Sequence, residues 1–147
     1  MNYWLLTPEI TLSVFAAAVI VVDLFVSEKR VLVGLSVAGL AASAGFTIAL
    51  WGERSAFGSV LVVDGFGLFF KLLFLGVAIL VILSSMDYVS KFSRFQGEYY
   101  ALILFSAVGM MLLAASVELI SIYIALELTT IPLCALVCIM RSQRSSE

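Results

Sequence analysis

Five long stretches of this chain are almost wholly apolar, and they limit its fold more than any other feature. Apolar residues make up 63% of the chain, whereas a soluble domain averages about 45–50%. A stretch of about 20 apolar residues can cross a bilayer as a helix. The sequence therefore predicts an all-α membrane protein with a single transmembrane domain over residues 1–147. We expect five helices, at about residues 8–26, 31–51, 65–86, 100–115 and 118–140.

The rest of the composition excludes several classes of function. Five spans leave no length for a soluble catalytic domain, and a net charge of −2 gives no sign of nucleic-acid binding. The chain has no His, which is the commonest metal ligand. Cys134 and Cys138 lie on one apolar span without further ligands, and no flavin, nicotinamide or iron–sulfur motif occurs. We therefore expect no metal and no cofactor on this chain.

Basic residues alternate between the connectors and predict how the chain crosses the membrane. The turn at 27–30, the connector at 87–99 and the tail after residue 140 carry two Lys or Arg each, whereas the connector at 52–64 carries only Arg54. Cytoplasmic loops hold the excess of basic residues. We therefore expect an external N-terminus and a cytoplasmic C-terminus, which requires an odd number of spans.

Two shorter features predict how the helices are joined and packed. Residues 59–63 are β-prone and short, which predicts a strand or hairpin arm lying on the membrane surface. In the second span, small residues recur at helical spacing: Gly34, Ala38, Ala41 and Gly45. Such a stripe lets another backbone approach closely, so we expect it to be a helix-packing face.

Glu127 is the candidate functional residue, because it lies in the middle of the fifth apolar stretch. It follows Glu118 by nine residues, or about 13–14 Å along a helix. This depth places it near the middle of a hydrocarbon core about 30 Å thick. An acid there costs at least about 2.5–3.5 kcal/mol, and proton or ion pathways are its usual use. The alternative is a protonated Glu hydrogen-bonded to a neighbouring helix.

The residues around Glu127 predict a polar seam along one helix face. Tyr123, Thr130 and Cys134 lie at i−4, i+3 and i+7 from Glu127, and these positions share its face. Each side chain can hydrogen-bond a carboxyl group or a water molecule. Glu118 lies about 180° round the helix and faces away.

Pro132, five residues after Glu127, lacks the backbone N–H that would bond to the carbonyl of Leu128. A kink beside a midplane acid is one way in which transporters open a small wet cavity. The alternative is a packing kink, which is common in membrane helices.

Other charged residues lie near the ends of spans. Lys71 is six residues into the third span, about 9 Å deep. It either extends outward to the interface or faces inward, so Lys71 and Glu118 are possible secondary site residues. At the start of the first span, Thr7 suits an N-cap, Pro8 the first helical position and Glu9 the positive helix end.

Four segments of the chain together resemble a known family. They are LTPEI, VDGFGLFFKLLF, GEYYALILFSAVGMMLLAAS and ELISIYIALELTTIPL. In this order and spacing the chain resembles the N subunit of bacterial NADH–quinone oxidoreductase, respiratory complex I, an antiporter-like subunit of the membrane arm. The resemblance covers essentially the whole chain.

The resemblance implies a subunit that couples quinone reduction to proton pumping. The acid of the LELxxxPL motif, here Glu127, would be the essential glutamate of the fifth helix, facing a lysine on the seventh. NADH, FMN, iron–sulfur clusters and quinone would be bound by partner subunits. The chain would lie in the bacterial inner membrane, in contact with the lipid bilayer and other membrane-arm subunits.

The resemblance also implies that the family's later helices are missing. The chain ends just before the sixth helix of that family, so it looks like a truncated, split or fragmentary subunit. Two alternatives remain open. One is a subunit of a multisubunit cation/proton antiporter, which shares this ancestry. The other is a scaffold or assembly fragment that transports nothing.

Overall fold

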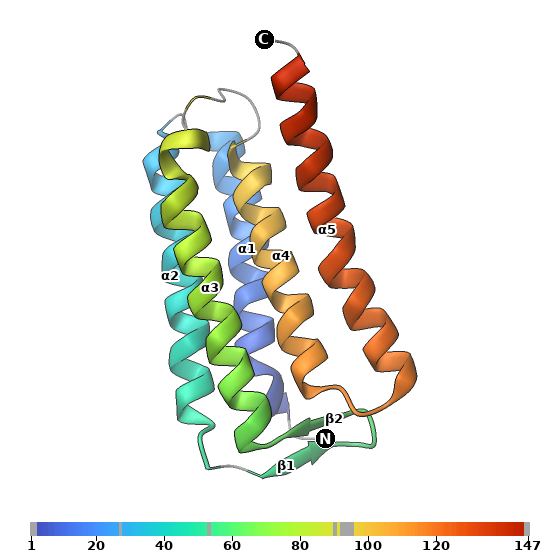
Figure 1. The fold of residues 1–147 in the computed structure, drawn as a ribbon. Helices are drawn as coiled ribbons and strands as arrows, with labels where there is room; N and C mark the ends of the chain where they lie inside the picture. Colours follow the sequence, from blue (N-terminus) through green and yellow to red (C-terminus); the bar gives the residue numbers. More distant parts are fainter. Residues whose placement is uncertain (1–2, 27, 53, 90, 92–95, 146–147) are drawn as a thin grey trace.

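The computed structural model describes residues 3–26, 28–52, 54–89, 91 and 96–145. It contains five long helices and a small hairpin (Figure 1). Each of the five helices is long and apolar enough to cross a membrane, which confirms the expected fold class. A short 3-10 turn, η1, precedes them, and the elements are η1 (Tyr3–Leu6), α1 (Thr7–Phe25), α2 (Lys29–Ala49), β1 (Ser55–Phe57), β2 (Leu61–Val63), α3 (Gly65–Val89), α4 (Gln96–Ala115) and α5 (Leu119–Ser145).

The connector between α3 and α4 is shorter than expected. We expected polar residues 87–99 to join the two spans, but α3 continues to Val89 and α4 already begins at Gln96. This expectation was wrong because polarity does not exclude helix where side chains pack. Gln96 and Tyr99 are both buried in the bundle. The remainder of the connector, residues 90 and 92–95, lies outside the described residues.

Of the strand expected at residues 59–63, the part Leu61–Val63 is present as one arm of a hairpin, and residues 59–60 belong to its turn. β1 and β2 pair antiparallel, and Gly58 between them has φ +63°, a left-handed conformation that glycine adopts without strain. The hairpin crosses the end of the bundle where α3 and α5 begin (Figure 1). Leu61 forms a bridge with Ser116, and the Val117 amide donates to the Val60 carbonyl at 3.0 Å. The hairpin thereby holds the turn between α4 and α5.

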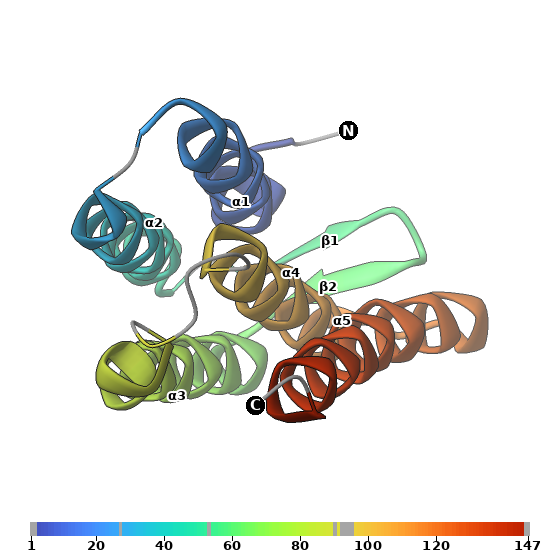
Figure 2. The same cartoon turned by 90° about the horizontal axis from the view of Figure 1, so that it is seen from above.

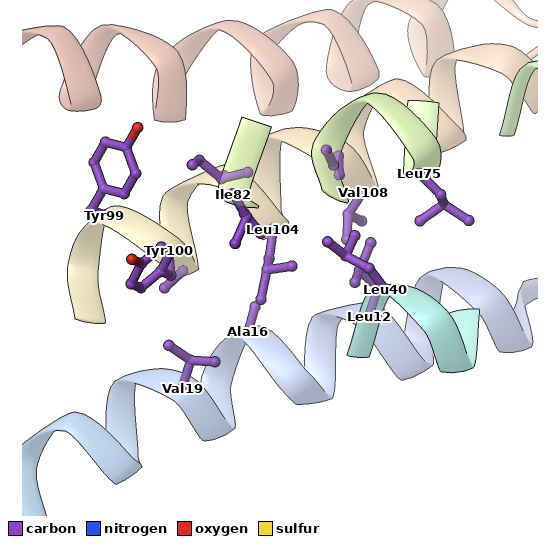
Figure 3. Close-up of a cluster of buried hydrophobic side chains, with 14 of the residues drawn as sticks. Leu12, Ala16, Val19, Leu40, Leu75, Ile82, Tyr99, Tyr100, Leu104 and Val108 are labelled. Carbon is purple, nitrogen blue, oxygen red and sulfur yellow. The ribbon is translucent and has the colours of Figure 1, made fainter. Parts of the chain in front are cut away.

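Helix α4 is the centre of the bundle, and the other four helices surround it (Figure 2). Within its most apolar segment 61% of α4 is buried, against 17% for α5, so α4 contributes most to the core and α5 least. Figure 3 shows the main cluster, in which all four helices other than α5 supply fully buried side chains. They include Leu12, Ala16 and Val19 of α1, Leu40 of α2, Leu75 and Ile82 of α3, and Tyr100 and Leu104 of α4.

The stripe of small residues on α2 does not pack against any other helix that the structure describes. Gly34, Ala38, Ala41 and Gly45 are all exposed, and a Cβ built on Gly34 or Gly45 would meet no atom within 4 Å. The stripe is therefore not a packing face within the described bundle, because small residues allow close approach on any face without selecting one, and contact with a helix of another chain stays a prediction.

The side of α2 that faces the bundle carries hydroxyl groups. Ser36 and Thr47 are buried and donate to carbonyls of their own helix, while Ser43 donates to the Pro8 carbonyl of α1 at 2.9 Å. Close approach occurs at Gly39, where a Cβ would lie 2.6 Å from the Cβ of Phe15. Satisfied hydroxyl donors and one close glycine, rather than the stripe, define the packing face.

The direction of insertion can be tested with single cysteines. After replacement of Cys134 and Cys138, we expect an impermeant maleimide added outside to label Ser59→Cys, on the hairpin, and not Ser142→Cys, near the end of α5. Both positions are exposed, and the basic residues of the tail favour the cytoplasm. Disruption of the membrane should make Ser142→Cys reactive. Labelling of Ser142→Cys alone in intact cells would reverse the assignment.

Candidate functional site

Helix α5, which carries Glu127, packs closely only against α4 within the part of the chain that the structure describes. Its buried residues are Ala125, Pro132 and Leu136. An apolar groove of about 450 Å³ separates the second half of α5 from α3, with Val77, Ala78 and Val81 on one side and Leu133, Leu136 and Val137 on the other. One side of α5 therefore contacts the bundle, and the rest faces outward.

The predicted polar seam lies on the outward side of α5. Thr129 touches α4, and Glu127 precedes it by two residues, which is about 200° round a helix. Glu127 is half-buried, whereas Tyr123 is 64% exposed and Thr130 and Cys134 are exposed. The four residues thus share a face, as their spacing predicts, and this face points away from the other four helices.

The hydroxyl groups near Glu127 donate to the backbone. Thr130 Oγ1 donates to the Leu126 carbonyl at 2.9 Å and lies 3.4 Å from the Glu127 carbonyl, while Thr129 Oγ1 donates to Ala125 at 2.8 Å. The Thr130 proton is thus not offered to the Glu127 carboxyl group, although its oxygen can still accept a bond. Such bonds to the preceding turn commonly bend helices.

Helix α4 approaches α5 closely just after Glu127. A Cβ built on Gly109 would lie 2.6 Å from Thr129 Oγ1, 2.7 Å from the Thr129 nitrogen and 2.8 Å from the Leu128 carbonyl carbon. One turn earlier, Ser106 Oγ donates to the Thr129 carbonyl at 3.2 Å. The backbone beside Glu127 is therefore in direct contact with α4.

Pro132 lies on the side of α5 that faces α4. It is buried, and the helix continues through it to Ser145. Proline cannot donate the bond to the Leu128 carbonyl. The segment that Gly109 contacts therefore includes the carbonyl that has lost its helical partner.

A buried ion pair forms a second charged site, at the hairpin end of the bundle. Lys71 Nζ of α3 lies 2.5 Å from Glu9 Oε1 of α1, and the two side chains are 2% and 5% exposed. Of the two alternatives for Lys71, the inward-facing one is confirmed. Apart from the Lys71 ammonium group, neither carboxylate oxygen of Glu9 has a polar partner among the described residues, so Lys71 is the group that compensates its charge.

The sequence pattern identifies both residues of this pair but not their pairing. Glu9 by itself suits the positive end of a helix, and the position of Lys71 is compatible with either direction. The end of the bundle at which each residue lies is the signal that could have predicted their pairing. Since α1 and α3 both begin at the same end of the bundle, a charge in an early turn of each lies at similar depth. The remaining secondary candidate, Glu118, is exposed in the turn before α5, and its carbonyl accepts from Ile122.

The structure brings no metal ligands together in the residues that it describes, where no group of three His, Cys, Asp or Glu side chains could hold an ion. Cys134 and Cys138 are free and exposed. Glu127 itself contributes a carboxyl group, which can take up or release a proton, to the outward-facing seam.

Comparison with known proteins gives a consistent set of relatives. The chain is 44% identical over 146 residues to NADH-quinone oxidoreductase subunit N of Dehalococcoides mccartyi, covering 97% of this chain and 30% of the relative. It is 44% identical over 140 residues to the subunit N of Moorella thermoacetica, covering 92% and 29%. The chain thus spans about a third of the length of these relatives. No protein-family model matches it.

A solved structure agrees with these relatives. The fold matches a chain of the respiratory complex I from Thermus thermophilus with bound aureothin, with a TM-score of 0.75 and 31% sequence identity. The match covers 88% of this chain and 28% of the other. The five-helix arrangement is therefore similar to part of a complex I subunit.

Proposed function

We propose that this chain is a membrane-arm subunit of a proton-translocating NADH–quinone oxidoreductase, or a piece of one. In this proposal Glu127 is a proton relay in a pathway coupled to quinone reduction. The chain itself carries no redox centre. NADH, FMN, iron–sulfur clusters and quinone are bound by partner subunits, and the complex lies in the bacterial inner membrane.

The observation that carries this proposal is the placement of Glu127. Its seam faces away from the bundle, and no described cation forms an ion pair with it. Lys71, the buried cation of the described residues, is already paired with Glu9. A carboxyl group within an apolar helix needs a partner or water, so we infer that the group or water that serves Glu127 comes from outside the described part of these five helices. The similarity to subunit N gives the class of complex that supplies it.

The partners can be tested by purification. We expect an affinity tag on this chain, expressed from its own gene, to recover NADH–quinone oxidoreductase subunits from membranes solubilised in mild detergent. The tagged fraction should oxidise NADH with a quinone acceptor. Recovery of cation/proton antiporter subunits instead would favour the alternative function. Assembly with the oxidoreductase, together with normal proton translocation in Glu127→Ala, would favour a scaffold that transports nothing.

A further inference from the structure

The close approach of α4 to α5 acts on the backbone rather than on a flexible side chain. Two of the three atoms nearest to a Cβ on Gly109 belong to the backbone of Leu128 and Thr129. A backbone atom cannot rotate out of the way. Any side chain at position 109 must therefore push α5 away from α4 by several tenths of an ångström, since real Cβ contacts below 3.0 Å essentially do not occur.

Ser106 adds a directional bond at the same point. Its hydroxyl donates to the Thr129 carbonyl at 3.2 Å. Together, the bond from Ser106 and the missing Cβ of Gly109 constrain both the height and the rotation of this turn relative to α4. Pro132 makes the turn more dependent on these contacts, because the Leu128 carbonyl lacks its intrahelical donor.

Glu127 lies on the same helical turn as the Leu128 and Thr129 backbone that Gly109 contacts. It precedes Thr129 by two residues, so it projects about 200° away from the contact. No other described helix packs closely against α5. A displacement of this turn away from α4 therefore moves Glu127 as well, and no other described helix packs closely enough against α5 to oppose it.

We propose that Gly109 and Ser106 are positioning residues for proton transfer at Glu127. This inference rests on the proposed function of Glu127. They contact neither the carboxyl group nor the proton. They determine where α5 presents the carboxyl group, and with it the distance over which a proton passes to the next group on the pathway.

The test compares Gly109→Ala with Gly76→Ala, made in the gene for this chain and assayed in the assembled complex in sealed membrane vesicles. Gly76 is an exposed helical glycine of α3, and a Cβ there would meet no atom within 4 Å. The two variants thus add the same methyl group, and only one displaces α5. Misplacement by 1 Å can lower the rate of a positioned reaction by about a hundredfold, so we expect about a tenfold loss of proton translocation in Gly109→Ala and none in Gly76→Ala.

Two readouts do not depend on the amount of complex: protons moved per NADH oxidised, and the solvent deuterium isotope effect on turnover. We expect Gly109→Ala to lower the first and raise the second, because a longer proton transfer becomes rate-limiting. If only the amount of assembled complex falls, or if Gly109→Ala matches Gly76→Ala, the inference is wrong.

Two further variants keep the outcome decisive. If Gly109→Ala does not assemble, Ser106→Ala replaces it, since that change removes the bond to Thr129 without a clash. A raised isotope effect in Ser106→Ala supports the inference, and an unchanged one contradicts it. Glu127→Gln reports on the underlying function: a normal proton ratio in that variant overturns the proposed function and the inference with it, whereas a low ratio beside a normal Gly109→Ala overturns the inference alone.

Discussion

Replacing Lys71 by Met should destabilise the chain by about 3–5 kcal/mol, which is the usual effect of breaking a buried ion pair by removing one partner. The change leaves Glu9 buried without compensation, because its carboxylate oxygens have no polar partner other than Lys71 among the described residues. Glu9→Met should have a similar effect by leaving the Lys71 ammonium group alone. Unfolding by sodium dodecyl sulfate in mixed micelles, followed by circular dichroism, measures both.

The double variant Glu9→Met/Lys71→Met separates the pair from general damage. Apolar replacement of a whole buried pair is often neutral or stabilising, so we expect the double variant to be clearly more stable than either single variant. Lys91→Met serves as the control, because Lys91 is exposed and its loss should change the free energy of unfolding by less than about 0.5 kcal/mol. Additive effects of the two single changes would show that the pair contributes no coupling.

The sequence predicts the number and position of the helices because the apolar runs are long and the breaks between them are polar. The β-prone segment at 59–63 predicts a strand. The common face of Tyr123, Glu127 and Thr130 follows from helical spacing alone. These features depend on local sequence, which is why they can be predicted without knowing how the helices pack.

Features that depend on helix packing could not be predicted. Lipid-facing and core-facing residues of a membrane helix are similarly apolar, so periodicity does not identify the buried side. For this reason the sequence did not show which side of α2 is buried. The stripe of small residues faces outward, while Gly39 makes the close contact. The contact of Gly109 with Thr129 joins residues of two helices at one register, and a single sequence does not specify that register.

Replacing Glu127 by Gln should stop proton transfer through this chain in the proposed assembly. Gln keeps the size and hydrogen-bonding capacity of Glu but cannot take up and release a proton. Loss of a positioned proton-transfer group lowers a rate by about 10²–10⁴-fold. Because Glu127 is half-buried on the outward face of α5, the change should leave the bundle folded. Glu127→Asp keeps the carboxyl group but moves it closer to the helix backbone by one methylene group, so we expect partial activity.

Glu118→Gln is the matched control for this experiment. Glu118 is the other acid near α5, is exposed in the preceding turn, and has no place in the proposed pathway. The decisive measurement is the number of protons taken up per NADH oxidised, in sealed inverted membrane vesicles with normal amounts of assembled complex. The proposed function predicts a ratio that falls in Glu127→Gln and is unchanged in Glu118→Gln. An unchanged ratio in Glu127→Gln would show that Glu127 does not carry protons, and would contradict the proposal.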